Sequence, residues 1–281
     1  MKSKANNFYD MHLSNKAFIM ANAWSAGSAV LLEESGFEAI ATTSAGIAFK
    51  HAVPDYEGAV SFDTALNETR KIAQAVTIPV SMDAENGYAD SAEDVYKNMQ
   101  RIFSTGVVGA NIEDYTGNKK RPLYDLELAK DRIQAANQAA TNLAFPFTLT
   151  ARCDSFLTGH NDDPLDEAIK RLNHYREAGA NCLFVPGIKD IKTIKTVVKE
   201  VNGPLTVVMG LAGTPISLAE LDEAGVARIS IGGSLARATY GLIRNAAKEM
   251  LEKGTFEFSS QQIADTELCR LFSMKVAEKT E

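Results

Sequence analysis

Short apolar segments alternate with longer amphipathic segments along most of the chain. Eight of the short segments are rich in apolar or β-branched residues, as strands buried on both faces are. They are residues 17–22, 39–43, 79–83, 107–113, 147–152, 181–185, 205–209 and 228–231. The pattern therefore predicts eight buried strands, each separated from the next by room for a helix.

The segments between the predicted strands carry helix signals. After residue 152, Asp163 can cap a helix, Pro164 suits its first position, and apolar residues recur at helical spacing until Gly179 ends it. Strand and helix in regular alternation imply parallel strands with right-handed crossovers. We expect eight such units to close into a (β/α)₈ barrel. The alternative is an open doubly wound sheet, but no Gly-x-Gly-x-x-Gly follows the first strand.

No low-complexity stretch or Pro/Gly-rich linker divides the chain, so residues 1–281 are predicted to form a single domain. One such barrel commonly occupies about 250 residues. Residues 254–281 would then be a C-terminal helical extension. Within it, residues 261–275 resemble an extra helix that could pack on a partner subunit.

Charge and cysteine content limit the functional classes. A net charge of -7 argues against a nucleic-acid binder, and no apolar run is long enough to span a membrane. Three cysteines do not form a disulfide framework, and no export signal is evident, so we expect a cytoplasmic protein. A small anionic substrate fits this composition if local cations receive it.

Charged residues follow the third, fourth and fifth predicted strands, where a barrel keeps its reactive groups. They are Asp83 and Glu85, then Glu113, then Arg152 and Asp154. Asp83 and Glu85 would share a face if the chain stays extended. Converging carboxylates suit a hard dication such as Mg²⁺, held directly or through water, and Arg152 would bind a substrate acid group. The alternative is a set of helix caps. Alternation turns Asp114 away from Glu113, so a structural ion pair is an equal alternative to a role in the site.

Two further segments lie near the same predicted rim. Residues 115–124 contain Asn118, Lys119 and Lys120 and suit a flap that closes over an anion, although a solvated loop is the plainer interpretation. After the second strand, the turn Ser44-Ala45-Gly46 could offer hydroxyl and backbone N–H groups to an oxyanion, or could be merely a tight turn.

The segments Asp83-Ala84-Glu85-Asn86-Gly87-Tyr88, Asn111-Ile112-Glu113-Asp114 and Ala151-Arg152-Cys153-Asp154 resemble signatures of the isocitrate lyase/phosphoenolpyruvate mutase superfamily. The resemblance implies that Asp83, Glu85 and Glu113 hold Mg²⁺, or Mn²⁺ in its place. It implies substrate contacts from Ser44, Ala45, Gly46, Asn118 and Arg152. It also implies catalytic roles for Ser44, Asp55, Lys119, Lys120 and Arg152, and a homotetramer or dimer with C-terminal helices swapped between subunits.

The resemblance implies a Mg²⁺-dependent lyase that breaks a carbon–carbon bond in a small 2-oxo or 2-hydroxy acid through an enolate. Isocitrate and 2-methylisocitrate lyases carry Cys and His in the flap, which this chain lacks, so it looks like a divergent branch. The main alternative is cleavage or rearrangement of a phosphorus–carbon bond, as in phosphoenolpyruvate mutase and phosphonopyruvate hydrolase.

Two other barrel functions are weaker alternatives. A Schiff-base aldolase needs a lysine at a strand end, and no predicted strand offers one. A phosphate cup could form from Gly210 and Gly213 with Gly232, Gly233 and Ser234, although close packing of short loops explains these residues better.

Overall fold

The eight predicted strands form one closed parallel barrel in the computed structural model, which describes residues 1–55, 58–159, 163–211 and 215–277. The strands are β1 (Phe18–Ala23), β2 (Ile40–Thr42), β3 (Val80–Asp83), β4 (Gly109–Glu113), β5 (Thr148–Arg152), β6 (Cys182–Phe184), β7 (Leu205–Val208) and β8 (Arg228–Ser230). β1 pairs with both β2 and β8, which closes the ring and confirms the barrel over the doubly wound sheet.

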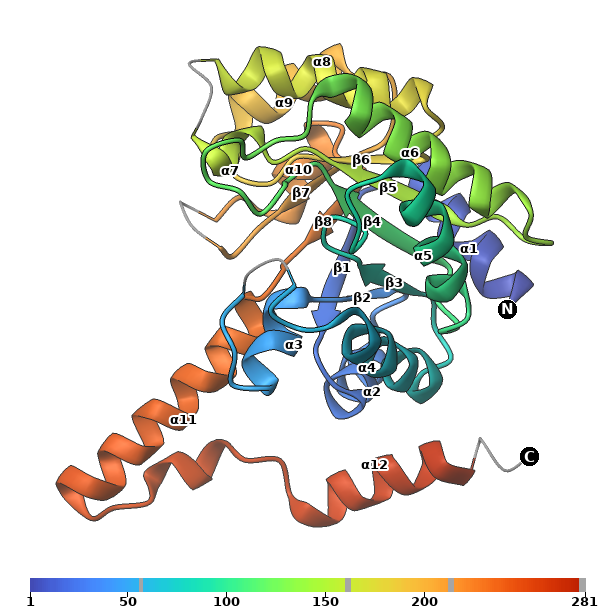
Figure 1. Cartoon of the computed structure of the whole chain (residues 1–281). Helices are drawn as coiled ribbons and strands as arrows, with labels where there is room; N and C mark the ends of the chain where they lie inside the picture. Colours follow the sequence, from blue (N-terminus) through green and yellow to red (C-terminus); the bar gives the residue numbers. More distant parts are fainter. Residues whose placement is uncertain (56–57, 160–162, 212–214, 278–281) are drawn as a thin grey trace.

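Helices surround the barrel, as Figure 1 shows. They are α1 (Lys2–Leu13), α2 (Ala26–Glu34), α3 (Ser44–Lys50), α4 (Phe62–Ala75), α5 (Ala92–Phe103), α6 (Leu126–Thr141), α7 (Ser155–Thr158), α8 (Pro164–Glu177), α9 (Ile191–Glu200), α10 (Leu218–Glu223), α11 (Ser234–Lys253) and α12 (Asp265–Ala277), with a 3₁₀ turn at Glu257–Gln261. Side-chain caps define where several helices begin: the Asp163 carboxylate accepts from the first turn of α8, as predicted, and the Ser91 hydroxyl does so for α5.

None of the described helices is both long and apolar enough to span a bilayer.

The sequence pattern missed α1, which closes the amino-terminal end of the barrel. Its Phe8 and His12 are buried, and Phe8 packs in a cluster with Met20 and Val108 of the strand region. The buried face of this helix carries the small Ala5 and the polar His12 beside Phe8, so its hydrophobic periodicity is weak. The lower end of the barrel is therefore sealed, and only the carboxyl ends of the strands remain for chemistry.

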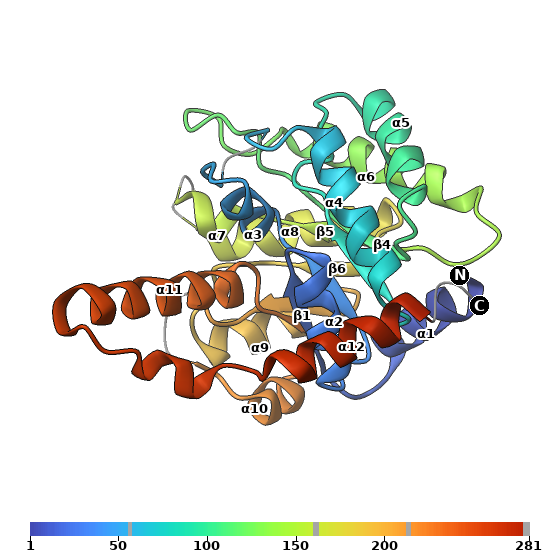
Figure 2. The same cartoon turned by 90° about the horizontal axis from the view of Figure 1, so that it is seen from below.

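The C-terminal extension contains the expected extra helix, displaced by a few residues from 261–275 to α12. Figures 1 and 2 show α11 leading away from the barrel and α12 running back toward α2. Lys275 of α12 forms an ion pair with Glu33 of α2, with 3.0 Å between nitrogen and oxygen. The arm formed by α11 to α12 thus touches its own barrel at the α12 end.

Candidate active site

Asp83 ends β3 and is held between neighbouring strands. One carboxylate oxygen accepts from the backbone N–H of Ser44 at 2.9 Å, and the other accepts from the side-chain amide of Asn111 on β4, also at 2.9 Å. Its own N–H donates to the Thr42 hydroxyl at 2.9 Å. Strand pairing across β2, β3 and β4 therefore sets the position of this carboxylate.

Glu85 does not lie on an extension of β3, contrary to the alternation argument. The strand ends at Asp83, and Glu85 has a φ of 47°, in the left-handed region that side-chain-bearing residues seldom adopt. The turn nevertheless buries its carboxylate, which accepts from the Gly58 N–H at 3.1 Å and the Tyr88 hydroxyl at 2.8 Å. A backbone turn, and not strand alternation, brings Glu85 toward the mouth.

The pKa of the Tyr88 hydroxyl shows which acidic groups act on it. Its pKa is raised by burial and then by the negative charges of Glu85, Asp83 and Glu113. All three predicted metal-binding carboxylates are thus near enough to one phenol to disfavour its ionisation. Asp83, Glu85 and Glu113 thus lie at or just beyond the carboxyl ends of β3 and β4, where their charges act on the same phenol.

Arg152, which is half-buried, is the cation of this cluster. Its guanidinium makes two hydrogen bonds to Asp154, at 2.6 and 2.8 Å, and a third nitrogen lies 2.7 Å from a Glu113 oxygen. Burial alone would lower the pKa of Arg152, but Asp154 and Glu113 raise it overall. The predicted common direction of Arg152 and Asp154 is confirmed by this two-point contact.

Asp55 and the segment Ser44 to Gly46 border the carboxylates. Partial burial, and then the charge of Asp83, raise the pKa of Asp55, while Arg152 and a hydrogen bond with the Ser44 side chain oppose the change. The Ser44-Ala45-Gly46 segment is the first turn of α3, capped by Thr43, and is not the isolated turn expected from the sequence. The Ser44 N–H donates to the Asp83 carboxylate, and the Gly46 N–H donates to the Thr43 hydroxyl oxygen.

The predicted flap forms a hairpin-like loop after β4. Tyr115 and Leu123 make an antiparallel bridge, and Thr116 donates its N–H to the Pro122 carbonyl at 2.8 Å. The loop covers a cavity of about 440 Å³ beside Arg152, and its lining residues are Tyr115, Lys119, Pro122, Arg152, Asp154, Leu157 and Thr158. Lys119 is thereby placed on the same cavity as Arg152.

The other two flap residues lie elsewhere. Asn118 lines a separate cavity with Asp90 and Tyr124, and its side-chain oxygen accepts from the backbone N–H of Lys120 at 2.9 Å. Lys120 is exposed and lines neither of these two cavities. The structure therefore separates Lys119 from Asn118 and Lys120, which sequence spacing could not distinguish.

Asp114 makes a structural ion pair, one of the two roles that alternation left open. It is buried, and one oxygen accepts from the Tyr175 hydroxyl at 2.6 Å and from Arg171 at 3.2 Å. The other oxygen accepts from the Asp154 backbone N–H at 2.9 Å. Asp114 thus fastens β4 to α8 and supports the turn that carries Asp154.

The oxygen-rich mouth suits a hard cation that retains water. Within the described ranges, no three His, Cys, Asp or Glu side chains are grouped closely enough to ligate one metal ion directly. Mg²⁺ needs only one or two direct carboxylates, because water fills its other positions. Asp83, Glu85 and Glu113 offer oxygen atoms alone, and their three negative charges exceed the positive charge of Arg152 beside them. These residues fit a largely hydrated Mg²⁺.

The glycines near β7 and β8 serve packing in the residues described. A Cβ atom on Gly210 would lie 2.9 Å from the Ser234 hydroxyl oxygen, and the Gly232 N–H is donated to Asn22 at 3.0 Å. Gly213 lies outside the described residues. These contacts favour close packing of short loops over the phosphate cup.

Sequence reasoning overlooked two residues that hold the carboxylates. Asn111 binds Asp83, and alternation could have revealed it, because Asn111 lies two residues before Glu113 on β4. Tyr88 binds Glu85 from a position that also has positive φ, 52°, and its ring stacks on Phe62 with centroids 4.7 Å apart. No periodic signal predicts that second contact.

The barrel and its carboxylate-lined mouth define a class of lyases and mutases, and comparison with known proteins agrees. The sequence pattern of the phosphoenolpyruvate phosphomutase family matches residues 8–251. The chain therefore belongs to this family, within the phosphoenolpyruvate mutase/isocitrate lyase superfamily.

Three similar proteins illustrate the range of the superfamily. The 2-methylisocitrate lyase of Escherichia coli (strain K12) is 29% identical over 239 residues, 82% of this chain and 78% of that protein. A presumed lyase/mutase from Burkholderia cenocepacia J2315 has a TM-score of 0.93 and 44% identity, covering 96% of both chains. A 2,3-dimethylmalate lyase has a TM-score of 0.85 and 26% identity, covering 99% of both chains.

Proposed function

We propose that the protein is a Mg²⁺-dependent lyase that cleaves a carbon–carbon bond in a small 2-oxo or 2-hydroxy carboxylic acid. The observation that carries the proposal is the convergence of Asp83, Glu85 and Glu113 around one mouth that also contains Arg152. The similarity to 2-methylisocitrate and 2,3-dimethylmalate lyases favours carbon–carbon chemistry.

The carboxylates have distinct tasks in this proposal. Asp83 would contact the cation, while Glu85, Glu113 and Asp55 would hold its water molecules. When bound, the cation supplies positive charge that stabilises an enolate oxygen as the bond breaks. Tyr88 and Asn111 orient two of the carboxylates through the hydrogen bonds described above.

The cavity beside Arg152 indicates where the far end of the substrate lies. Arg152 is already bound to Asp154 and Glu113, so it has little capacity left for a substrate with several acid groups. Lys119 is the flap cation that lines this cavity, and Pro122 and Leu157 give it an apolar wall. We infer that the substrate carries one distal anionic group and a small apolar branch.

Turnover of a substrate panel tests the proposal directly. The protein with Mg²⁺ would be mixed with 2-oxo and 2-hydroxy mono-, di- and tricarboxylic acids, and release of pyruvate or glyoxylate would be measured. We expect turnover of at least one acid with an apolar branch, and loss of turnover with EDTA. If phosphonopyruvate alone is consumed, as followed by phosphorus NMR, the function is the alternative phosphorus–carbon chemistry.

Adjacent lysines provide a matched test of the flap. Lys119→Met removes the cation that lines the cavity, so we expect kcat/KM to fall about a hundredfold. Lys120→Met removes the same charge from an exposed position and should change kcat/KM by less than about threefold. Equal losses in both variants would contradict a specific role for Lys119.

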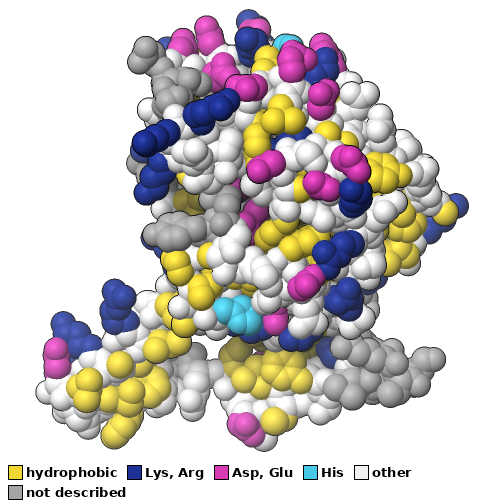
Figure 3. Space-filling model, viewed as in Figure 1, with side chains coloured by type: hydrophobic (Ala, Val, Ile, Leu, Met, Phe, Trp, Pro, Cys, Tyr) yellow, Lys and Arg dark blue, Asp and Glu magenta, His cyan; other side chains and the backbone are white. Residues whose placement is uncertain are grey.

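We also propose that the C-terminal arm joins subunits in a homotetramer or dimer. Ile243, Leu251 and Phe256 are 60%, 88% and 64% exposed, and Figure 3 shows apolar side chains gathered on the arm. Such a concentration of exposed apolar surface is typical of an interface. Sedimentation of the full chain should give an oligomer, and Leu251→Glu with Ile243→Glu should yield monomers. A monomeric wild type would refute the proposal.

A further inference from the structure

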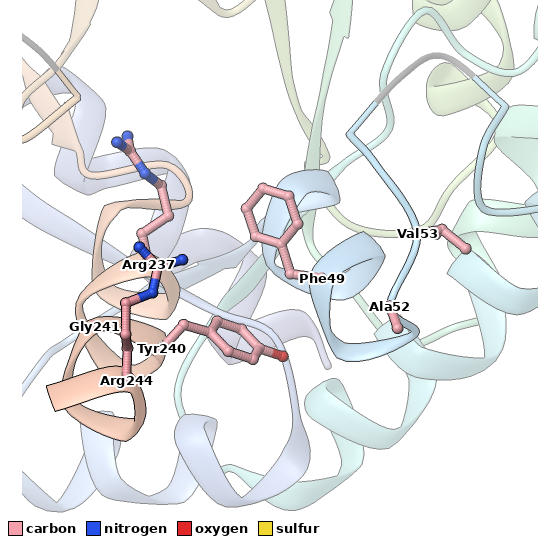
Figure 4. Close-up of a pocket in the computed structure, with 7 residues that line it drawn as sticks. All are labelled: Phe49, Ala52, Val53, Arg237, Tyr240, Gly241 and Arg244. Carbon is pink, nitrogen blue, oxygen red and sulfur yellow. The ribbon is translucent and has the colours of Figure 1, made fainter. Parts of the chain in front are cut away.

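The arginines outside the mouth differ in their surroundings. Arg237 and Arg244 of α11 line a cavity of about 480 Å³ between α3 and α11, shown in Figure 4, on the arm that we propose another subunit covers. Arg132 of α6 is instead only 1% exposed within the chain itself. Burying a guanidinium is unfavourable unless protein contacts replace its water, so the contacts of Arg132 indicate its role.

Arg132 holds the backbone of the turn at residues 85–89, which follows β3. One of its terminal nitrogens donates to the carbonyl of Asn86 and, at 2.8 Å, to that of Ala89. Asn98 of α5 donates its side-chain amide to the two carbonyls between them, at 2.9 and 3.1 Å. Two side chains from α5 and α6 therefore bind four consecutive carbonyl groups of the turn.

This turn needs support because its backbone is strained. Glu85 and Tyr88 have φ values of 47° and 52°, and residues with side chains keep such conformations only where their surroundings compensate. The same two residues carry the carboxylate and the hydroxyl that meet at the mouth, 2.8 Å apart. Relaxation of the turn would therefore displace a carboxylate that we assign to the cation.

The same guanidinium contacts the end of the flap. Its central carbon lies 3.8 Å from the centroid of the Tyr124 ring, in a cation–π contact. The Tyr124 hydroxyl donates to Asp90 and accepts from the Asn86 side chain at 3.4 Å. Tyr124 thus connects the last residue of the flap both to Arg132 and to the turn.

We propose that Arg132, together with Asn98, is a positioning residue for the cation: it keeps the strained turn in the conformation that places Glu85 at the mouth, and it ties the flap to that turn. Neither side chain lines the cavity beside Arg152, so both act through the backbone of the turn and not by touching the substrate. The inference rests on the proposed function, because that function assigns Glu85 to the cation.

Hydrogen exchange in EDTA tests the turn without metal or substrate. The amides of Gly87 and Tyr88 donate hydrogen bonds within the turn, so their exchange reports its order. Arg132→Met should speed exchange in a peptide covering residues 84–90 by roughly tenfold, and a peptide covering 182–184 should not respond. Arg132→Lys keeps the charge and a donor, so it should fall between wild type and Arg132→Met.

Mg²⁺ affinity, measured by calorimetry, tests the consequence for the cation. Arg132→Met and Asn98→Leu should each raise the Kd for Mg²⁺ by roughly 10–100-fold, as the loss of a group that orients a metal ligand does. Arg132→Lys should recover part of the affinity. If Arg132→Met fails to fold, Arg132→Lys and Asn98→Leu still test the inference through exchange and affinity.

Tyr124→Leu tests the connection to the flap. The change removes the ring from Arg132 and the hydroxyl from Asp90, so exchange should speed by about threefold or more in residues 84–90 as well as in residues 115–124. A response of the flap alone would show that the flap and the turn are not connected through Tyr124.

Matched control residues lie at the amino end of the barrel. Arg176 and Asn173 of α8 also donate to backbone carbonyls, those of Asn202 and Glu200, each at 3.0 Å. Arg176→Met and Asn173→Leu remove equivalent contacts away from the mouth, so exchange in residues 84–90 and Mg²⁺ affinity should stay within about twofold of wild type.

The outcomes separate this inference from the proposed function. Wild-type exchange of the turn in both Arg132→Met and Asn98→Leu would overturn the inference, and so would equal losses of Mg²⁺ affinity in the control variants. If the turn responds as expected but the wild-type protein binds no Mg²⁺, the proposed function is overturned, while Arg132 is still shown to hold the turn.

Discussion

Arg152 and Arg228 are both arginines of the barrel strands, the first half-buried and the second buried, but their surroundings are opposite. Arg152 at the mouth contacts the carboxylates of Asp154 and Glu113. Arg228, deep in the barrel, has no carboxylate among its described contacts: it donates to the Thr150 hydroxyl at 3.1 Å and lies 3.0 Å from a His12 ring nitrogen. Burial lowers the pKa of Arg228, whereas acidic neighbours raise that of Arg152.

The comparison indicates a functional role for Arg152 and a structural role for Arg228. At the mouth, negative charge exceeds positive charge, and the arginine organises carboxylates that a cation can join. At the lower end, neutral groups from α1 and β5 satisfy much of the guanidinium, although its Nε has no partner among the described residues. Arg228 therefore contacts α1 through neutral groups, whereas Arg152 and its carboxylates form the charged cluster at the mouth.

The largest effect should come from Arg152→Met. The change leaves Glu113 and Asp154 buried without their cation, so we expect the free energy of unfolding to fall by about 3–5 kcal/mol and turnover to fall by roughly 10²–10³-fold. Urea unfolding and steady-state kinetics on the substrate found in the panel would measure both.

The matched change is Arg228→Met. It removes a charge that no described carboxylate compensates, so we expect the free energy of unfolding to change by less than about 1 kcal/mol. Turnover should stay within about twofold of wild type, because Arg228 lies away from the mouth. If Arg228→Met abolishes turnover while Arg152→Met does not, the division between the two ends of the barrel is wrong.

The neighbouring carboxylates Asp114 and Glu113 should differ in the same way, the first affecting stability and the second Mg²⁺ binding. Asp114→Asn weakens the buried contacts with Arg171 and Tyr175, and we expect it to lower the free energy of unfolding by about 2–3 kcal/mol. Its turnover should change little. Glu113→Gln should instead weaken Mg²⁺ binding by roughly 10–100-fold, measured by calorimetry. Equal Mg²⁺ affinity in the two variants would contradict the different roles.

At neutral pH, the ionisation of His12 should have the smallest effect on stability, because it acts only in acid. Burial, and then the charge of Arg228, lower its pKa from 6.5 to about 3 in the folded protein. As pH falls below 6.5, the unfolded chain binds this proton first, so stability that is complete above pH 6.5 declines toward pH 3. The decline is at most about 1.4 kcal/mol per pH unit.

His12→Gln should flatten this part of the stability profile, because glutamine can still accept from Arg228 without titrating. His174→Gln makes the same change at a half-buried position of α8 and serves as the control. Urea unfolding between pH 4 and 7 would compare the two, and identical slopes would show that His12 does not couple to folding.

The sequence by itself determined the barrel and the order of its charged strand ends. A repeated local pattern specifies strands and helices, and parallel crossovers leave few ways to arrange eight of them. The common direction of Arg152 and Asp154 and the turning away of Asp114 also followed from alternation along strands, because β4 and β5 remain regular up to Glu113 and Arg152.

Contacts between distant segments determine the course of the chain beyond the strand ends. The positive φ of Glu85, the start of α3 at Ser44 and the separation of Lys119 from Lys120 depend on contacts with residues distant in sequence, such as Gly58 and Asp83. The seal formed by α1 and the cavity between α3 and α11 have the same origin. Local patterns cannot predict these features, because each is stabilised by packing between segments that are distant in the sequence.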